Sequence, residues 1–362
     1  MTVYVLIQAG NAGTHWTSLF LRGISGEAKS RGMQLVEAES NGDTLPPEFL
    51  GAETVLAVGA SFLWTDRTAK LLRSRGIRPI LVGCANQNGL LASGFSVADY
   101  ERATKDLLDY FFAQGRRRVA LFGVSSDSSA DLLKMKAFLR YRGGCFSYND
   151  IFYFRGQTKN LCESMVTMVS RYDAVICAND VTGLMLMQTL KDAGIHIPDE
   201  LFIAGFGDVT YRRNLPSKLT IATLDCVSAG RNAVDICSRI RRDPSLSYIT
   251  IKMRCAIDVR ESTANLPFEE AIDPPEQTPR EEYDLFSDAP LTSIMLAEKI
   301  IAECDELDIE ILRMLRAGRR NSDIAETLHA SESTVKYRLK RLLNFAGLAS
   351  RSELLSILSS HF

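Results

Sequence analysis

Between residues 3 and 259 the sequence alternates short apolar runs with longer amphipathic stretches. The apolar runs predict strands at residues 3–7, 54–58, 80–82, 118–122, 174–177 and 201–204. The amphipathic stretches predict helices at residues 16–31, 66–75, 99–114, 129–140, 159–170 and 180–193. Such alternation is typical of parallel sheets with helices on both faces, joined by right-handed crossovers. Because domains usually run about 100–200 residues, we expect residues 1–261 to form an α/β domain of two lobes with a cleft between them.

The stretch from residue 262 to residue 290 has a different composition. Five of its residues are prolines, which lack the backbone N–H that a helix interior needs. Eight acidic residues accompany a single basic residue, Arg280. We interpret this stretch as an acidic, partly extended linker. An acidic loop packed on one lobe would have the same composition.

Residues 291–362 show helical periodicity, and the segment from Asp305 onward predicts four short helices. The third of these has an apolar side, formed by Val335, Leu339, Leu342 and Ala346. Its other side carries basic and hydrogen-bonding residues and no acid, namely Ser333, Lys336, Tyr337, Lys340, Arg341 and Asn344. A helix fits the major groove of DNA, where such side chains can reach base edges.

Charge supports a local nucleic-acid surface. The whole chain has 42 basic and 44 acidic residues, so it is not a polycation. Between residues 311 and 351, however, nine basic residues accompany only three acids. We predict base contacts from Lys336, Tyr337 and Lys340, a further polar contact from Ser333, and phosphate contacts from Arg320, Arg338 and Arg341. A basic helical bundle with a solvated face would show the same charge excess.

The spacing of several motifs in this segment resembles the LuxR-type helix-turn-helix. The motifs are Glu310-Ile311-Leu312, Ala317-Gly318, Asn321-Ser322-Asp323-Ile324-Ala325, Ser331-x-x-Thr334-Val335-Lys336 and Gly347-Leu348-x-x-Arg351-x-Glu353-Leu354. The resemblance implies a recognition helix over residues 332–344 and a fourth helix that often serves as a dimer contact. The sequence departs from the family at Arg338, where histidine is common, and at Asn344-Phe345, where a basic pair is common.

The front domain resembles the effector-binding domain of the LacI/GalR family, which is itself similar to periplasmic sugar-binding proteins. The clearest matches are residues 172–180 (YDAVICAND), 190–194 (LKDAG), 197–200 (IPDE) and 205–208 (GFGD). The resemblance implies a small-molecule effector bound between two lobes. LacI-type regulators carry their DNA-binding helices at the N-terminus, whereas here the helix-turn-helix pattern follows the α/β domain.

Ligands of open α/β sheets bind beyond the carboxyl ends of the strands. The loop after the first strand holds Asn11, His15 and Trp16, which offer polar edges and an aromatic face. Asp180 directly follows another strand, where it can accept hydrogen bonds from ligand hydroxyls or instead cap the helix that it starts.

The LacI/GalR resemblance adds Asp208 and Lys134 as candidate ligand residues. Asp208 aligns with the second acid of the family's paired-acid motif, while Gly207 takes the place of the first. Lys134 stands where the family often has arginine. These departures argue against a simple hexose as the effector.

No catalytic or metal-binding motif is evident. The sequence has no P-loop and no G-x-S-x-G elbow, its four histidines are scattered, and its eight cysteines form no C-x-x-C pair. We expect reduced thiols, no cofactor, no metal, no signal peptide and no membrane span.

Together these patterns predict a cytoplasmic, homodimeric regulator that binds double-stranded DNA and senses a small polar metabolite. Two alternatives remain open. The front domain could be a dimerisation or protein-interaction scaffold without a ligand, or the chain could be a sugar-binding carrier.

Overall fold

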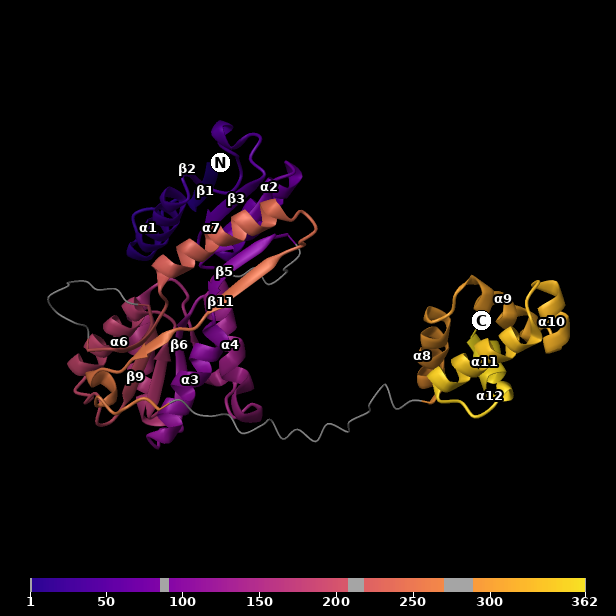
Figure 1. Ribbon diagram of the computed structural model, residues 1–362. Coiled ribbons are helices and arrows are strands. Elements are labelled where there is room, and N and C mark those ends of the chain that lie inside the picture. The colour runs from indigo at the N-terminus through magenta and orange to yellow at the C-terminus, as the bar shows by residue number, and fades with distance from the viewer. Residues whose placement is uncertain (1, 85–90, 208–217, 270–288, 362) are drawn as a thin grey trace. The chain divides into compact units, whose positions relative to one another are not determined.

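The computed structural model describes residues 2–84, 91–207, 218–269 and 289–361. The chain divides into two compact units, Met1–Ile272 and Asp273–Phe362. The first unit holds two six-stranded sheets, and the second is built from helices (Figure 1). The predicted fold class, a two-lobed α/β domain followed by a small helical domain, is confirmed.

The sheet of the first lobe is entirely parallel, in the order β11-β5-β4-β3-β1-β2. Its strands are β1 (Thr2–Gln8), β2 (Gln34–Ser40), β3 (Thr54–Val58), β4 (Arg78–Val82), β5 (Gly94–Ala98) and β11 (Ile249–Met253). Helices α1 (His15–Ser30) and α7 (Cys226–Arg242) pack on one face, and α2 (Phe62–Ser74) packs on the other. Both faces of the central strands are therefore buried, which explains their continuous apolar runs.

Helices α1 and α7 approach each other closely, as Figure 1 shows for this lobe. Gly23 and Gly230 make this approach possible. A Cβ atom on Gly23 would stand 2.0 Å from the carbonyl oxygen of Val227, and one on Gly230 would stand 2.3 Å from that of Phe20. These distances exclude any side chain at either position unless the helices move apart.

The sheet of the second lobe has the order β12-β10-β9-β8-β6-β7. Its strands are β6 (Val119–Val124), β7 (Ile151–Tyr153), β8 (Ala174–Cys177), β9 (Phe202–Phe206), β10 (Thr220–Thr223) and β12 (Ala256–Asp258). Only β12 runs antiparallel to its neighbour. Helices α3 (Tyr100–Ala113) and α4 (Ser129–Arg140) cover one face, and α5 (Thr158–Met168) and α6 (Asp180–Asp192) cover the other. Short 3₁₀ turns of the unit lie at Pro47–Phe49, Tyr141–Gly143, Tyr148–Asp150, Val169–Arg171 and Glu261–Thr263.

The chain passes between the lobes three times within the first unit. It crosses from β5 to α3, from β10 to α7, and from β11 to β12. The lobes also meet where loops follow β3 and β6, because Ser61 and Ser128 form an isolated β-bridge. Since each loop follows the carboxyl end of its strand, the carboxyl edges of the two sheets approach each other at this point.

The second unit contains α8 (Ala289–Ala302), α9 (Glu306–Arg316), α10 (Asn321–Thr327), α11 (Glu332–Ala346) and α12 (Arg351–His361). Its core combines apolar residues from all five helices, namely Ala297, Ile300, Ile311, Leu312, Leu315, Ile324, Ala325, Val335, Leu339, Leu342, Leu354 and Leu358. The four helices expected from residue 305 onward are present, and α8 packs against them as a fifth.

Candidate effector site and nucleic-acid interface

The loop after β1 places the first three predicted ligand residues at the carboxyl edge of the first sheet. Asn11 is partly exposed, and its carbonyl oxygen accepts hydrogen bonds from the Thr14 backbone (3.0 Å) and hydroxyl (2.8 Å). His15 is exposed at the start of α1. The ring of Trp16 is half-buried and stands edge-on to Phe20, with 5.8 Å between centroids. Trp16 therefore contributes to the lobe core as well as to this edge.

Asp180 lies at the carboxyl edge of the second sheet, where α6 begins. It is buried, and its Oδ1 accepts the backbone N–H of Val181 at 2.9 Å. The neighbouring Asn179 caps the same helix by accepting the Thr182 N–H at 2.8 Å. The N-cap of α6 is therefore Asn179, and Asp180 is the first residue of the helix, where the helix dipole favours a negative charge.

Gly207, at the end of β9, stands directly against Asp180. Its φ is +108°, and a Cβ atom there would lie 3.0 Å from the Asp180 carboxylate. An acid at position 207 would therefore meet a steric and an electrostatic obstacle. This contact gives a physical reason for the absence of the first acid of the paired motif. Asp208, the second, lies outside the described residues.

Lys134 is buried, with 4% of its surface exposed. Its Nζ donates to Asp131 Oδ1 at 3.0 Å and to the carbonyl oxygen of Ala178 at 2.6 Å. It also lies 4.8 Å from the ring centroid of Tyr100 and 4.5 Å from that of Phe206. Lys134 consequently ties α4 to β8, β9 and the start of α3.

Sequence reasoning missed the contact between the lobes at Asp127. The Asp127 carboxylate accepts the Ser61 hydroxyl at 2.7 Å and the Leu63 N–H at 3.0 Å, and its carbonyl oxygen accepts the Phe62 N–H at 2.7 Å. Asp127 thereby places a negative charge at the N-terminus of α2, where the helix dipole favours one. The only sequence signal was the run of helix-capping residue types from Ser125 to Ser129.

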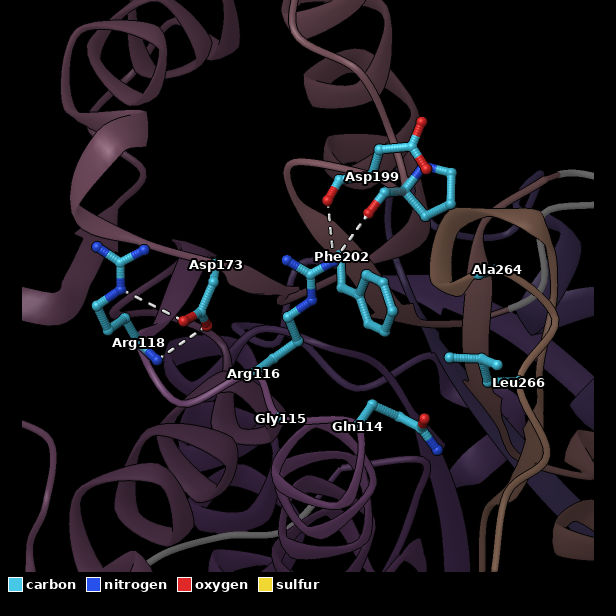
Figure 2. A pocket seen from close by; sticks show the side chains of 10 residues that line it. Gln114, Gly115, Arg116, Arg118, Asp173, Asp199, Phe202, Ala264 and Leu266 are labelled. Carbon is cyan, nitrogen blue, oxygen red and sulfur yellow. Dashed lines mark hydrogen bonds and ion pairs between the residues drawn. The ribbon is translucent and has the colours of Figure 1, made fainter.

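A 610 Å³ cavity lies at the opposite, amino-terminal edge of the second sheet (Figure 2). Arg116 stacks over Phe202 and donates to the carbonyl oxygens of Pro198 and Asp199 at 3.3 and 3.0 Å. Arg118 is held by Asp173 at 3.3 Å. Because these guanidinium groups already bind protein oxygens, and because ligands of such sheets bind at the carboxyl edge, we do not assign the effector to this cavity.

Helix α11 exposes the residues predicted to contact bases. Tyr337 is 70% exposed, and Ser333, Lys336 and Lys340 are also exposed. Lys336 forms an ion pair with Glu332 at 2.7 Å, one turn earlier. Among the residues that the structure describes, none forms an ion pair with Lys340. The opposite side of α11 is buried, as the apolar spacing predicts.

Arg338 and Arg341 differ from the lysines of α11, because both bind acids at the start of another helix, α9. Arg338 Nη1 donates to Asp305 Oδ2 at 2.7 Å and to Asp308 Oδ1 at 3.0 Å. Arg341 Nη2 donates to Asp308 Oδ2. The guanidinium of Arg338 lowers the pKa of Asp305 to about 2.

Arg320 lies at the start of α10 and is exposed. Its backbone N–H donates to Asp323 at 3.3 Å, and its guanidinium, which has donors and no acceptor, does not cap the helix. Arg351 links α12 to this region by donating to Asn321 Oδ1 and to the Arg319 carbonyl oxygen, each at 3.1 Å. The structure therefore keeps the Arg320 side chain on the surface of the unit that also exposes α11.

Two family models match the chain. Residues 108–263 match the periplasmic binding protein-like domain, and residues 307–358 match the bacterial regulatory proteins of the luxR family. The chain combines a periplasmic binding protein-like domain with a LuxR-type helix-turn-helix. Within the described helices of these domains, none is both long and apolar enough to cross a membrane. The described residues also contain no cluster of three or more metal-ligand side chains.

The similar curated proteins are transcription regulators. The ribose operon repressor of Haemophilus influenzae is 28% identical over 104 residues, which are 29% of this chain and 31% of that protein. The regulator GalR of Streptococcus thermophilus is 23% identical over 229 residues, which are 60% of this chain and 68% of that protein. The shared region thus spans about a third to two thirds of these relatives.

The periplasmic binding protein-like domain also has structural neighbours. The complex of the transcriptional regulator CelR with cellobiose superposes with a TM-score of 0.63 at 17% identity, covering 72% of this chain and 84% of that one. At this identity the likeness establishes the shared fold of the front unit. It gives no residue-level account of a ligand.

Proposed function

We propose that this protein is a ligand-responsive, DNA-binding transcription regulator. The main observation in support is the exposed face of α11. There Lys336, Tyr337 and Lys340 project from a helix whose other side is buried in a LuxR-type domain. This face matches the dimensions and chemistry of the major groove. We assign base contacts to these three residues, a supporting contact to Ser333 and a phosphate contact to Arg320.

The proposed effector is a small polar metabolite, sugar-like or nucleoside-like, bound at the carboxyl edges of the two sheets. Asn11, His15 and Trp16 would contribute from the first lobe, and Asp180 and Asp208 from the second. Carboxylate and amide groups suit ligand hydroxyls, and an aromatic ring suits the face of a sugar or base. The ribose and cellobiose named for the similar proteins support a sugar-like class.

The geometry of Lys134 sharpens this assignment. Since its ammonium already has a carboxylate and a carbonyl partner, Lys134 shapes the second lobe from within. We propose that its effect on the effector is indirect, through Ala178 and the start of α6. Gly207, which makes room for the Asp180 carboxylate, leaves that acid as the proposed hydroxyl acceptor.

We propose a homodimer in the cytoplasm, where two copies of α11 would read half-sites about 34 Å apart, one turn of DNA. The effector would act by binding one arrangement of the lobes more tightly than another, since a ligand shifts an equilibrium only through such a difference.

Fluorescence anisotropy tests the proposal. The full chain is titrated onto duplex DNA from upstream of its own gene, across a salt series, with a panel of sugars, sugar phosphates and nucleosides. Salt-sensitive binding that one compound shifts supports both parts. Binding that no compound alters would favour the alternative, in which the front domain is a dimerisation or protein-interaction scaffold. No binding to any duplex would overturn the proposed function.

A further inference from the structure

Asp308 is a buried carboxylate at the interface between α9 and α11. Its side chain has no exposed surface, whereas those of its two partners are 23% (Arg338) and 39% (Arg341) exposed. One carboxylate oxygen accepts Arg338 Nη1 at 3.0 Å, and the other accepts Arg341 Nη2. Each oxygen of this buried group is therefore occupied by a different arginine of the recognition helix.

The two arginines also have partners around Asp308. Arg338 reaches both carboxylate oxygens of Asp305, at 2.8 and 2.7 Å, and Arg341 lies 3.5 Å from the carbonyl oxygen of Glu303. Asp305 and Asp308 in turn cap α9 by accepting each other's backbone N–H, at 2.8 and 3.2 Å. The N-terminus of α9 is thus joined to α11 by several charged hydrogen bonds, although Arg341 Nε is buried without a hydrogen-bond partner among the described residues.

The positions on α11 matter because residues three apart lie on neighbouring points of a helix surface. Arg338 and Arg341 are three apart and stand between the buried stripe of Val335, Leu339 and Leu342 and the exposed residues. Fixing both arginines to one buried group restrains rotation of α11 about its own axis. That rotation decides which side chains face a groove.

We infer that Asp308, Arg338 and Arg341 form a positioning clamp, which sets the orientation of the recognition helix, and that neither arginine contacts a DNA phosphate. The inference rests on the proposed DNA binding. It replaces the phosphate contacts predicted from sequence for these two arginines. A buried carboxylate that loses its partners is strongly unfavourable, so release of the arginines to DNA would be opposed.

The decisive variant is Asp308→Asn, because the two roles predict effects of opposite sign. If the arginines position α11, loss of the carboxylate charge loosens the helix and weakens DNA binding, by about tenfold. If they are latent phosphate contacts, the same change frees Arg341 and leaves Arg338 only Asp305, which tightens binding and steepens its salt dependence.

The measurement is anisotropy of the full chain on a random-sequence duplex across a salt series, which needs no knowledge of the operator. Arg341→Gln should weaken binding with an unchanged slope of log K against log salt. The matched control is Arg320→Ala, whose slope should flatten by about 0.9, the value for one lost phosphate contact. Combining Asp308→Asn with Arg341→Gln should cost little more than either change alone.

Folding is checked by circular dichroism and by amide exchange of Leu339 and Leu342 in α11. If Asp308→Asn unfolds the unit, Arg341→Gln carries the test, since it leaves Arg338 on Asp308. A flattened slope in Arg341→Gln, or tighter binding by Asp308→Asn, overturns the clamp while the proposed function stands. A wild-type chain that binds no DNA overturns both.

Discussion

The carboxyl edge of the second lobe and the recognition helix α11 both carry basic residues where the sequence predicts a binding surface. In the lobe, Lys134 is buried among an acid, a carbonyl oxygen and two aromatic rings. On α11, Lys340 is exposed, and Arg338 lies between these extremes. Residue type and helical position alone do not separate these cases. Burial and partners decide whether a cation is available to a ligand.

Replacement of the buried residue, Lys134, should have the largest effect. Lys134→Met leaves Asp131 buried without its cation, so we expect the free energy of unfolding to fall by about 3 kcal/mol. Urea unfolding can be followed by tryptophan fluorescence, since the chain's two tryptophans, Trp16 and Trp64, both lie in the front unit. The double change Lys134→Met with Asp131→Asn should recover part of the loss. A single-variant loss below about 1 kcal/mol would show that Lys134 is not needed inside the lobe.

Replacement of the exposed residue, Lys340, should affect DNA binding and not stability. Lys340→Ala removes a side chain with no ion-pair partner in the described part of its unit, so unfolding should change by less than about 0.5 kcal/mol. DNA affinity should fall by about tenfold, from the loss of one base contact of roughly 1.4 kcal/mol. Anisotropy titrations measure this, with Glu326→Ala on the exposed surface of α10 as the matched control. Unaltered affinity would remove Lys340 from the interface.

Asp127 adds a third case to this comparison, a charged residue whose hydrogen-bond partners lie in the other lobe. Asp127→Ala removes two hydrogen bonds to the N-terminus of α2, and we expect a local loss of about 1 kcal/mol. Amide exchange of Leu63 should accelerate by about fivefold, while that of Leu72 in the same helix stays constant. Ser126→Ala, next in the chain and exposed, is the control. Equal exchange in both variants would mean that Asp127 does not hold the lobes together.

The smallest expected effect concerns pH. Because Arg338 lowers the pKa of Asp305 to about 2 from its ordinary value near 3.8, this pair stabilises the fold fully above about pH 4. The contribution is lost as the pH falls through about 2. In Arg338→Gln the Asp305 pKa should return toward its ordinary value, as a carboxyl titration by NMR would show. A pKa that stays near 2 would assign the shift to the helix cap instead.

The sequence predicted six of the central strands, β1, β3, β4, β6, β8 and β9, and missed the central strands β5 and β10. In β6, β8 and β9 every residue is buried, so the apolar runs are continuous. The edge strands β2, β7, β11 and β12 also escaped prediction. Among them, β2 has the polar sequence QLVEAES, and β11 alternates between half-buried and exposed residues. The sequence predicts a linker that extends to Pro290, whereas Pro290 lies in the first turn of α8, a position where proline is tolerated.

The sequence could indicate which candidate residues lie at strand ends, but not which groups they contact. Asp180 and Trp16 follow from the rule that strand ends form sites. The partners of Lys134 come from α4, the residue after β8, β9 and α3, and only Asp131 is close to it in sequence. Similarly, Arg338 and Arg341 share a helix with Lys340, but their partner Asp308 lies about thirty residues earlier. Long-range pairing of this kind leaves no periodic signal.

The three crossings between the lobes have a consequence for how the chain is made. The first lobe obtains α7 and β11 only after the second lobe, apart from its edge strand β12, has been synthesised. Until then, Val58 on the sheet and Phe20 and Ile24 on α1 would lack the α7 residues of their core cluster, Ala233 and Ile236. The second lobe, apart from its edge strand β12, is continuous from α3 to β10 and has no such delay. We therefore expect a nascent chain to complete the later lobe before the earlier one, so that a ribosome stalled near residue 225 would present a protease-sensitive N-terminal half.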